Sequence, residues 1–429
     1  MTSKSSPAEC YVYITLPGET EFVTAGKFAL GEDRRGISTG TFVYGRSYRA
    51  RQNAVPIDPL ELELGTKPFQ TTLLKGVFGA LRDATPDYWG RHVIDIRRGK
   101  AQPDELDYLL YSPDDRAGAL GFGLNQEPPA PRREFNRTMD LDRLQGLADA
   151  IIADEDLPDG PNTQLAQDLL QLGTSMGGAR PKTVVADDAG LWIAKFDRRD
   201  DEWNHARVER AMLVLARACG LQTPESKVTT VGNREVLLVK RFDRQKVASG
   251  YRRARMLSAL TLLRAGDTHQ DRDKWSYILF VEELRRISSQ PKTDAPELFR
   301  RMCFNALISN LDDHPRNHAV IAADGDWILS PAYDLLPSTP VGIERRDLAL
   351  TCGDMGRYAQ VDNLLSQGAR FLLERDEAKK IIDDMEQTVK ARWHDVARKE
   401  GVTETDCEKI VSAFAYPGFR LGATGQVTA

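Results

Sequence analysis

The order of strand-like and helical patterns along the chain limits its fold more than any other feature. Up to about residue 240, short runs rich in valine, tyrosine, phenylalanine and threonine are separated by Gly and Pro, such as YVYITL and GTFVYG. After Met256 helical periodicity dominates, as in KWSYILFVEELRRI and PELFRRMCFNALIS. A strand-rich part followed by a helical part predicts an α+β fold.

Three local signals refine this prediction. Pro86 and Asp87 mark a turn that leads into a helix over YWGRHVIDIRRG, and DELDYLLYS predicts a second short helix. EWNHARVERAMLVLARACG has one apolar face and predicts an amphipathic helix that ends near Gly220. The polar, proline-rich run NQEPPAPRREFNR, residues 125–137, predicts a boundary between modules.

Composition narrows the classes of protein that the chain can belong to. Its 429 residues are 41% hydrophobic and 28% charged, as in globular proteins, and suggest two or three domains. The net charge of -5 gives no overall attraction to nucleic acid or to an anionic membrane. The five cysteines form no CxxC pair, and the N-terminus has no apolar signal region. We therefore expect a cytoplasmic protein.

The fragment SNLDDHPRNHAVI carries the most informative spacing. Asp312 and Asn317 form a D-x-x-x-x-N pattern, which phosphoryl-transfer enzymes use to place a base and a metal ligand on one short loop. Asp, Pro and Asn are also ordinary residues where a helix stops, so this fragment taken alone favours a plain turn.

Three further fragments fit the same chemistry, although each has an ordinary structural explanation. Asp334 in LSPAYDLLPS follows a short apolar strand, where a carboxylate can hold magnesium but a turn is also common. TSMGGARPK has two glycines that suit a phosphate-binding loop or a simple turn, and it lacks the Walker spacing. Lys195 lies in an apolar strand and needs a partner such as Glu209, unless it reaches solvent.

Together these fragments occur in the order found in protein kinases, and the chain resembles the HipA family of bacterial serine/threonine kinases. The resemblance rests on TSMGGARPKT, WIAKF, LLVKRFDR, SNLDDHPRNHAVI and LSPAYDLLP, with TPDYWGR and GDMGRYAQVDNLL as further signatures. It implies a two-lobed kinase-like fold with three parts. These are a HipA-like N-terminal subdomain (8–124), an N-lobe with a Gly-rich loop (138–242) and a helical C-lobe (243–429).

The resemblance also implies roles for the matched residues. Asp312 would be the catalytic base, Asn317 and Asp334 would bind Mg²⁺, and Lys195 supported by Glu209 would contact ATP. The other ATP-binding positions that it implies are Ser175, Met176, Gly177, Gly178, Ala179, Lys182, Lys240, Arg241, Phe242, His314 and Arg316.

Regulation and partners follow from the same resemblance. Ser175 matches a serine that the family phosphorylates on itself, and phosphate there would repel a triphosphate. The implied partners are a small helix-turn-helix antitoxin, operator DNA through that antitoxin, and a protein substrate such as an aminoacyl-tRNA synthetase. One departure is that SNLD replaces the H-R-D of eukaryotic kinases, so the choice of Asp312 over Asp313 depends on spacing alone.

Three alternatives remain open at this stage. A zinc hydrolase would use Asp312, Asp313, His314 and His318, although Pro315 interrupts a helix between the two histidines. A pseudokinase would keep the fold and only bind an antitoxin or its DNA complex. Tyr88 and Trp89 suggest part of an antitoxin-docking surface, but Trp89 is as readily a core anchor.

Overall fold

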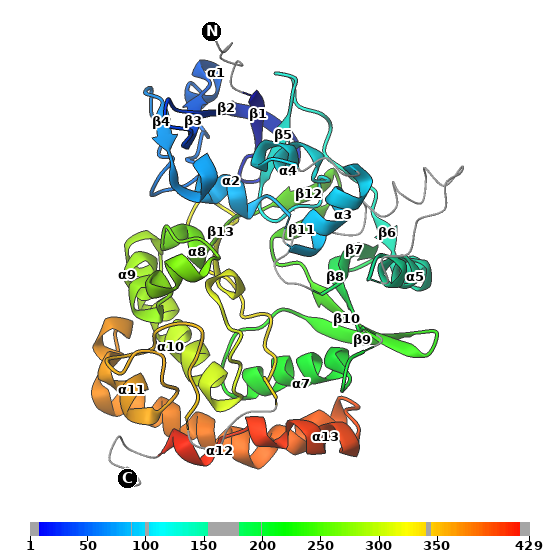
Figure 1. The fold of residues 1–429 in the computed structure, drawn as a ribbon, viewed down its shortest axis with the longest axis vertical. Coiled ribbons are helices and arrows are strands. Elements are labelled where there is room, and N and C mark those ends of the chain that lie inside the picture. Colours follow the sequence, from blue (N-terminus) through cyan, green and yellow to red (C-terminus); the bar gives the residue numbers. More distant parts are fainter. Residues whose placement is uncertain are drawn as a thin grey trace. The chain divides into compact units, whose positions relative to one another are not determined.

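The computed structural model describes residues 8–86, 88–98, 103–152, 180–198, 200–339 and 345–420 (Figure 1). The chain divides into two compact units. Unit 1 contains Met1–Phe196, Lys240–Arg264 and Ile321–Asp326, and unit 2 contains Asp197–Val239, Ala265–Val320 and Trp327–Ala429. Each unit is therefore built from stretches that are distant in sequence.

Unit 1 begins with an antiparallel five-stranded sheet in the order β4-β3-β2-β1-β5. Gly40 in β3 is required because a Cβ there would lie 1.8 Å from the carbonyl oxygen of Gly76. The predicted strands are confirmed. Buried and more exposed side chains alternate in β3, whereas all four residues Val12–Thr15 of β1 are buried. The strands are β1 (Ala8–Thr15), β2 (Phe22–Glu32), β3 (Ser38–Tyr44), β4 (Phe69–Thr71) and β5 (Leu120–Gly123).

Both helices predicted after the sheet strands are present. They are α3 (Tyr88–Arg98) and α4 (Glu105–Tyr111), and a capping box between Asp104 and Asp107 fixes the start of α4. Trp89 is only 3% exposed whereas Tyr88 is 74% exposed. Trp89 is therefore a core anchor, and its suggested place on a docking surface is wrong because its ring is buried.

A second group of strands in unit 1 carries two of the candidate ATP-binding lysines. β6 (Asn136–Arg137) runs parallel to β7 (Lys182–Asp187), which forms a hairpin with β8 (Gly190–Phe196). A further hairpin joins β11 (Arg244–Val247) and β12 (Gly250–Arg253). The helix α5 (Leu141–Ile152) lies between β6 and β7 in sequence, as its periodicity predicts.

Unit 2 is mainly helical. α7 (His205–Ala218) begins where the Asn204 side chain accepts a hydrogen bond from the Arg207 N–H at 2.8 Å, and Gly220 follows its end with φ +85. β9 (Ser226–Val231) and β10 (Arg234–Lys240) form a hairpin after it. The later helices include α9 (Tyr277–Ile287), α10 (Pro291–Leu307), α12 (Arg375–Lys399) and α13 (Glu404–Ile410).

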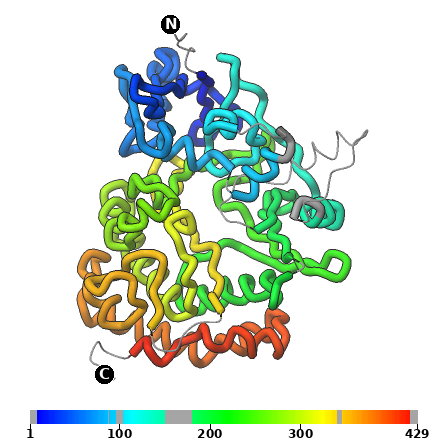
Figure 2. Tube along the Cα trace, in the orientation of Figure 1, coloured from blue at the N-terminus to red at the C-terminus, as the bar shows by residue number. Residues whose placement is uncertain are grey.

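The core of unit 2 forms around α10, whose side chains are buried on nearly every face. α10 packs against α9 and α12, and the trace in Figure 2 shows α12 running beside α7 despite their separation in sequence. At the end of α12, Glu400 accepts bonds from two α7 arginines, through its carbonyl from Arg207 at 2.8 Å and through its carboxylate from Arg210 at 3.1 Å. Polar contacts thus join the first half of α7 to the end of α12.

Two further properties concern the chain as a whole. All five cysteines are buried and unpaired, and burial raises the pKa of Cys10, Cys219 and Cys352 to about 12. Among the helices that the structure describes, none combines the length and the apolar character that a membrane span requires.

Candidate active site

The loop that carries Asp312 and Asn317 is shaped by what precedes and follows it. After α10 the chain turns sharply at Ser309, which has φ +51 and whose hydroxyl donates to the Ala413 carbonyl at 2.6 Å. Pro315–Asn317 then form one 3-10 turn, in which His314 Nδ1 accepts from the Arg316 N–H at 3.1 Å. β14 (Ala319–Ala322) follows directly. The loop is thus held at both ends by buried structure.

The two adjacent aspartates have different environments. Asp313 is 1% exposed, and its carboxylate accepts hydrogen bonds from the Tyr277 hydroxyl and, at 2.9 Å, from His318 Nε2. Asp312 is exposed, and among the described residues no hydrogen bond is found to its carboxylate. Asp313 therefore anchors the loop, while the carboxylate of Asp312 faces solvent and can accept a proton from a substrate.

Electrostatics distinguish Asp312 further. Partial loss of hydration raises the pKa of Asp312, His314 opposes this rise, and the carboxylates of Asp313 and Asp334 add to it. Burial lowers the pKa of His314, and the Asp312 carboxylate opposes this fall. A raised carboxylate pKa beside other carboxylates is typical of functional sites.

The remaining loop residues have defined contacts. The Arg316 guanidinium donates to Asp267 at 2.9 Å, and Asn317 is buried with its Nδ2 3.4 Å from the Asp312 carbonyl. Arg316 therefore reaches a neighbouring carboxylate, whereas Asn317 folds back over the loop that carries Asp312.

Asp334 lies on a second loop that is tied to the first. Its φ of +56 is a left-handed conformation that non-glycine residues seldom adopt, and such strain often occurs at ligand sites. Its carbonyl accepts from Asn310 Nδ2 at 3.2 Å, and the Tyr333 hydroxyl donates to the Arg316 carbonyl at 2.8 Å. The two loops are thus joined directly.

The residues of these loops fit a magnesium ion. Mg²⁺ prefers oxygen ligands, which Asp334 and the amide of Asn317 supply. The carboxylates of Asp312, Asp313 and Asp334 lie close enough to raise the pKa of Asp312, so a divalent cation would relieve their repulsion.

The zinc alternative is not supported. Among the described residues, no three His, Cys, Asp or Glu side chains are grouped as a metal site. In the alternative zinc site, His318 and Asp313 would not be available as ligands, because they are hydrogen-bonded to each other.

The candidate lysines of unit 1 lie on neighbouring strands. Lys182 in β7 is paired directly with Lys195 in β8, and Lys182 is 4% exposed while Lys195 is half-buried. Directly opposed residues of two strands have side chains on the same face. Two ammonium groups on one face of a hairpin provide positive charge of the kind that binds phosphate. Glu209 lies in unit 2, buried in α7.

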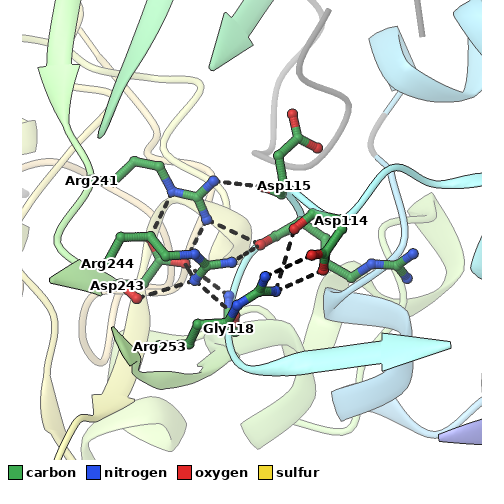
Figure 3. Close-up of polar contacts among 8 residues, drawn as sticks. Asp114, Asp115, Gly118, Arg241, Asp243, Arg244 and Arg253 are labelled. Carbon is green, nitrogen blue, oxygen red and sulfur yellow. Dashed lines mark hydrogen bonds and ion pairs between the residues drawn. The ribbon is translucent and has the colours of Figure 1, made fainter. Parts of the chain in front are cut away.

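The segment after β10 contains a buried network of arginines and aspartates (Figure 3). Arg241 donates to the Asp243 carboxylate at 2.9 and 2.7 Å, and Asp243 also accepts from Arg244 at 2.7 Å and from the Gly118 N–H at 2.9 Å. Burial alone would raise the pKa of Asp243, but the two guanidinium groups hold it well below its usual range.

This network includes Arg241, one of three neighbouring residues, Lys240, Arg241 and Phe242, that the resemblance gives as ATP-binding. The Arg241 side chain is buried and bonded to Asp243, and the backbone N–H of Arg241 donates to the Leu191 carbonyl at 2.9 Å. The Lys240 ammonium lies 5.6 Å from the centre of the Trp192 ring, and Phe242 is half-buried. Five predicted ATP-binding residues lie outside the described part of the chain: Ser175, Met176, Gly177, Gly178 and Ala179.

The sequence did not predict the buried partners of the loop that carries Asp312 and Asn317, although His318 was a candidate zinc ligand. Tyr277, Asn305, Asn310 and His318 bind one another or the two loops. Asn305 and Asn310 were detectable in principle, since both interrupt the apolar run FNALISNL. A polar residue in such a run needs a buried partner. Tyr277 gives no such signal.

Two family models match the chain. One, described as HipA N-terminal domain, matches residues 23–123, and the other, described as HipA-like C-terminal domain, matches residues 174–393. A Sinorhizobium fredii protein named "Putative kinase Y4mE" is 27% identical over 353 residues, which cover 75% of this chain and 77% of that protein. "Putative kinase Y4dM" of the same organism is 28% identical over 181 residues, covering 39% and 42%.

A solved structure extends the likeness to the fold. The HipA chain in the complex of Shewanella oneidensis HipA, HipB and operator DNA superposes with a TM-score of 0.67 at 16% identity. The superposition covers 93% of this chain and 95% of that one. The predicted α+β, kinase-like fold with a sheet-rich N-terminal region and a helical C-terminal region is confirmed.

Proposed function

The chain belongs to the HipA family, and from this premise we propose that it is a serine/threonine-protein kinase that transfers the γ-phosphoryl group of ATP to a protein hydroxyl. One observation carries the proposal. An exposed Asp312 lies beside a buried, hydrogen-bonded Asp313 on a loop that also presents Asn317 and is joined to the loop of Asp334.

In this proposal, Asp312 acts as the general base. Its carboxylate accepts the proton of the attacking hydroxyl while the oxygen forms a bond to the γ-phosphorus and the bond to the ADP oxygen breaks. The carboxylates of Asp313 and Asp334 strengthen the affinity of Asp312 for that proton.

Asn317 and Asp334 would hold Mg²⁺. The ion, when bound, neutralises negative charge on the phosphates of ATP. The protein's own contribution is positional, because the hydrogen bonds between the two loops keep Asn317 and Asp334 at a constant spacing.

Lys182 and Lys195 are the proposed phosphate-binding lysines, with Glu209 as the partner of Lys195. Their cross-strand pairing supports this assignment, since it concentrates positive charge on one face of the hairpin. Lys240 and Phe242 are the proposed neighbours of adenine, and the Gly-rich residues 175–179 are proposed to cover the phosphates.

Regulation and partners belong to the same proposal. Phosphate on Ser175 would place about two negative charges where a triphosphate binds, and would stop turnover. The Shewanella neighbour was solved with HipB and operator DNA, which supports an antitoxin partner that links this kinase-like toxin to DNA. A translation protein such as an aminoacyl-tRNA synthetase is the proposed substrate class.

A labelling experiment tests the proposed activity. Phosphatase-treated protein is incubated with radiolabelled ATP and Mg²⁺. Wild type should label itself, and Asp312→Asn should reduce the rate by about 10²–10⁴-fold because it removes the base. Asp324→Asn, which removes an exposed carboxylate in the turn after β14, is the matched control and should label at the wild-type rate.

The opposite result would favour a pseudokinase. If treated wild type takes up no phosphate in the presence of Mg²⁺, or if Asp312→Asn labels as fast as Asp324→Asn, the kinase proposal is wrong. Phosphoproteomics of cells expressing wild type or Asp312→Asn then identifies the target serine or threonine.

A further inference from the structure

A line of buried polar side chains runs beneath the catalytic loop of unit 2. Tyr277, at the start of α9, donates its hydroxyl hydrogen to the Asp313 carboxylate, and His318 Nε2 binds the same oxygen at 2.9 Å. The Tyr277 ring also packs against the His318 ring, with 5.3 Å between their centres. The backbone of Tyr277 is fixed in turn, because its N–H donates to the Thr351 carbonyl at 2.9 Å.

The line continues to the second loop. Asn305 Nδ2 donates to the Tyr277 hydroxyl oxygen at 3.0 Å, and Asn310 Nδ2 donates to Asn305 Oδ1 at 3.1 Å. Asn310 Nδ2 also donates to the carbonyl of Asp334 at 3.2 Å. A continuous path of hydrogen bonds therefore connects Asp313, next to the base, with Asp334.

Every hydrogen bond between side chains on this path has a defined direction. Burial raises the pKa of Tyr277 well above its usual value, and Asp313 adds to the rise, so the hydroxyl keeps its proton. Tyr277 must then donate to Asp313 and accept from Asn305, which in turn accepts from Asn310. The donors all point toward the negative charge of Asp313, an arrangement in which each bond polarises the next.

Three polar side chains on this path are almost completely buried. Tyr277 and Asn305 are 0% exposed, and Asn310 is 3% exposed. Buried polar groups are costly unless they are satisfied, and apolar side chains of similar size would fill the same space without that cost. Because these buried groups are all hydrogen-bonded only when the path is complete, the path favours one arrangement of the two loops over others.

We propose that Tyr277 and Asn310 are positioning residues, which set the spacing between the catalytic loop and the Asp334 loop and thereby the geometry of the metal site. The inference rests on the proposed kinase function and names residues that act through Asp313 and Asp334 without touching ATP. Residues behind metal ligands commonly alter metal affinity or activity by about 10–100-fold.

Tyr277→Phe tests this, since it removes one oxygen and keeps the buried ring. We expect the Mg²⁺ concentration for half-maximal rate to rise by about 10-fold or more. Binding of a fluorescent ATP analogue should show the same shift when Mn²⁺ is titrated, and binding without metal should be unchanged. Asn310→Ala, which cuts the path at the other end, should give the same shift.

Tyr416→Phe is the matched control, because it also removes a buried hydroxyl in unit 2, one that donates to the Ala359 carbonyl at 2.5 Å. Its thermal stability should fall like that of Tyr277→Phe, while its metal dependence stays at the wild-type value. In the double variant Tyr277→Phe/Asn310→Ala, the Mg²⁺ concentration for half-maximal rate should also rise. Its fold increase should be smaller than the product of the increases in the two single variants, because both substitutions interrupt the same path.

Two outcomes overturn the inference in distinguishable ways. If Tyr277→Phe and Asn310→Ala lose stability but keep the metal dependence of Tyr416→Phe, the path only supports the fold, and the kinase proposal survives. If wild type shows neither phosphoryl transfer nor metal-dependent nucleotide binding, the proposed function falls and the inference falls with it.

Discussion

Asp312 and Asp313 are neighbours in the chain, yet their surroundings give them different chemistry. The sequence distinguished them only by the spacing to Asn317. The structure adds a physical reason, since Asp313 is enclosed by Tyr277 and His318 while Asp312 faces solvent. A carboxylate that already accepts two buried hydrogen bonds is poorly placed to take a proton from a substrate, and this supports Asp312 as the proposed base.

This difference predicts that two substitutions affect stability to different extents. Asp313→Ala should lower the free energy of unfolding by about 2–4 kcal/mol, because it leaves the Tyr277 hydroxyl and His318 buried without their acceptor. Asp312→Ala should change it by no more than about 0.5 kcal/mol, as is usual at exposed positions. Urea unfolding followed by circular dichroism measures both, and equal losses would contradict the assignment of Asp313 as an anchor.

At the scale of elements, the segment after β10 is held by charge in addition to apolar packing. Asp243 binds Arg241 and Arg244 and also accepts from the backbone of Gly118. It therefore ties the start of β11 to the chain that leads into β5. Within unit 1, this carboxylate joins Gly118 to the sequence-distant residues Arg241 and Arg244.

Removing the negative charge of Asp243 should strongly lower the free energy of unfolding. Asp243→Asn keeps the side-chain shape but leaves two buried guanidinium groups without their counter-charge, and we expect a loss of about 3–5 kcal/mol in the free energy of unfolding. Asp188→Asn, an exposed aspartate in the β7–β8 turn, is the control and should stay within about 0.5 kcal/mol of wild type. A small loss for Asp243→Asn would show that the network is dispensable for stability.

Elements with local signals could be predicted from the sequence, and contacts between distant residues could not. The β7–β8 hairpin follows from the ADDAG turn and its flanking alternation, and α4 follows from its apolar spacing. The contact between Tyr277 and Asp313 joins residues 36 positions apart on different elements. Nothing local to either residue specifies the other. The candidate site was predictable where spacing carries chemistry, as in Asp312 to Asn317, and not where tertiary packing decides.

At the scale of the whole molecule, stability depends on pH through buried carboxylates that act in opposite directions. Asp243 has a lowered pKa in the folded state, so its contribution is complete at neutral pH and is lost only as the solution becomes acidic. Asp58 is 0% exposed, and burial raises its pKa from 3.8 to about 6. Its Oδ1 accepts from the Leu60 N–H at 2.7 Å, while no partner is found for Oδ2 among the described residues.

The sign of the Asp58 effect follows from these values. Above pH 6 the carboxylate is charged in both the folded and the unfolded chain, and its burial lowers stability. As the pH falls from 6 toward 4, the folded chain takes up the proton first, so the free energy of unfolding rises. Asp58→Asn cannot titrate and removes this rise.

The free energy of unfolding of Asp58→Asn minus that of wild type should therefore be about 2 kcal/mol more positive at pH 8 than at pH 4. Any constant cost of burying the new amide cancels in this comparison, and so does the loss at Asp243, which both proteins share. Urea unfolding of the two proteins across this pH range measures the difference. A difference that does not vary with pH would mean that Asp58 titrates near its ordinary pKa and that the buried turn is open to water.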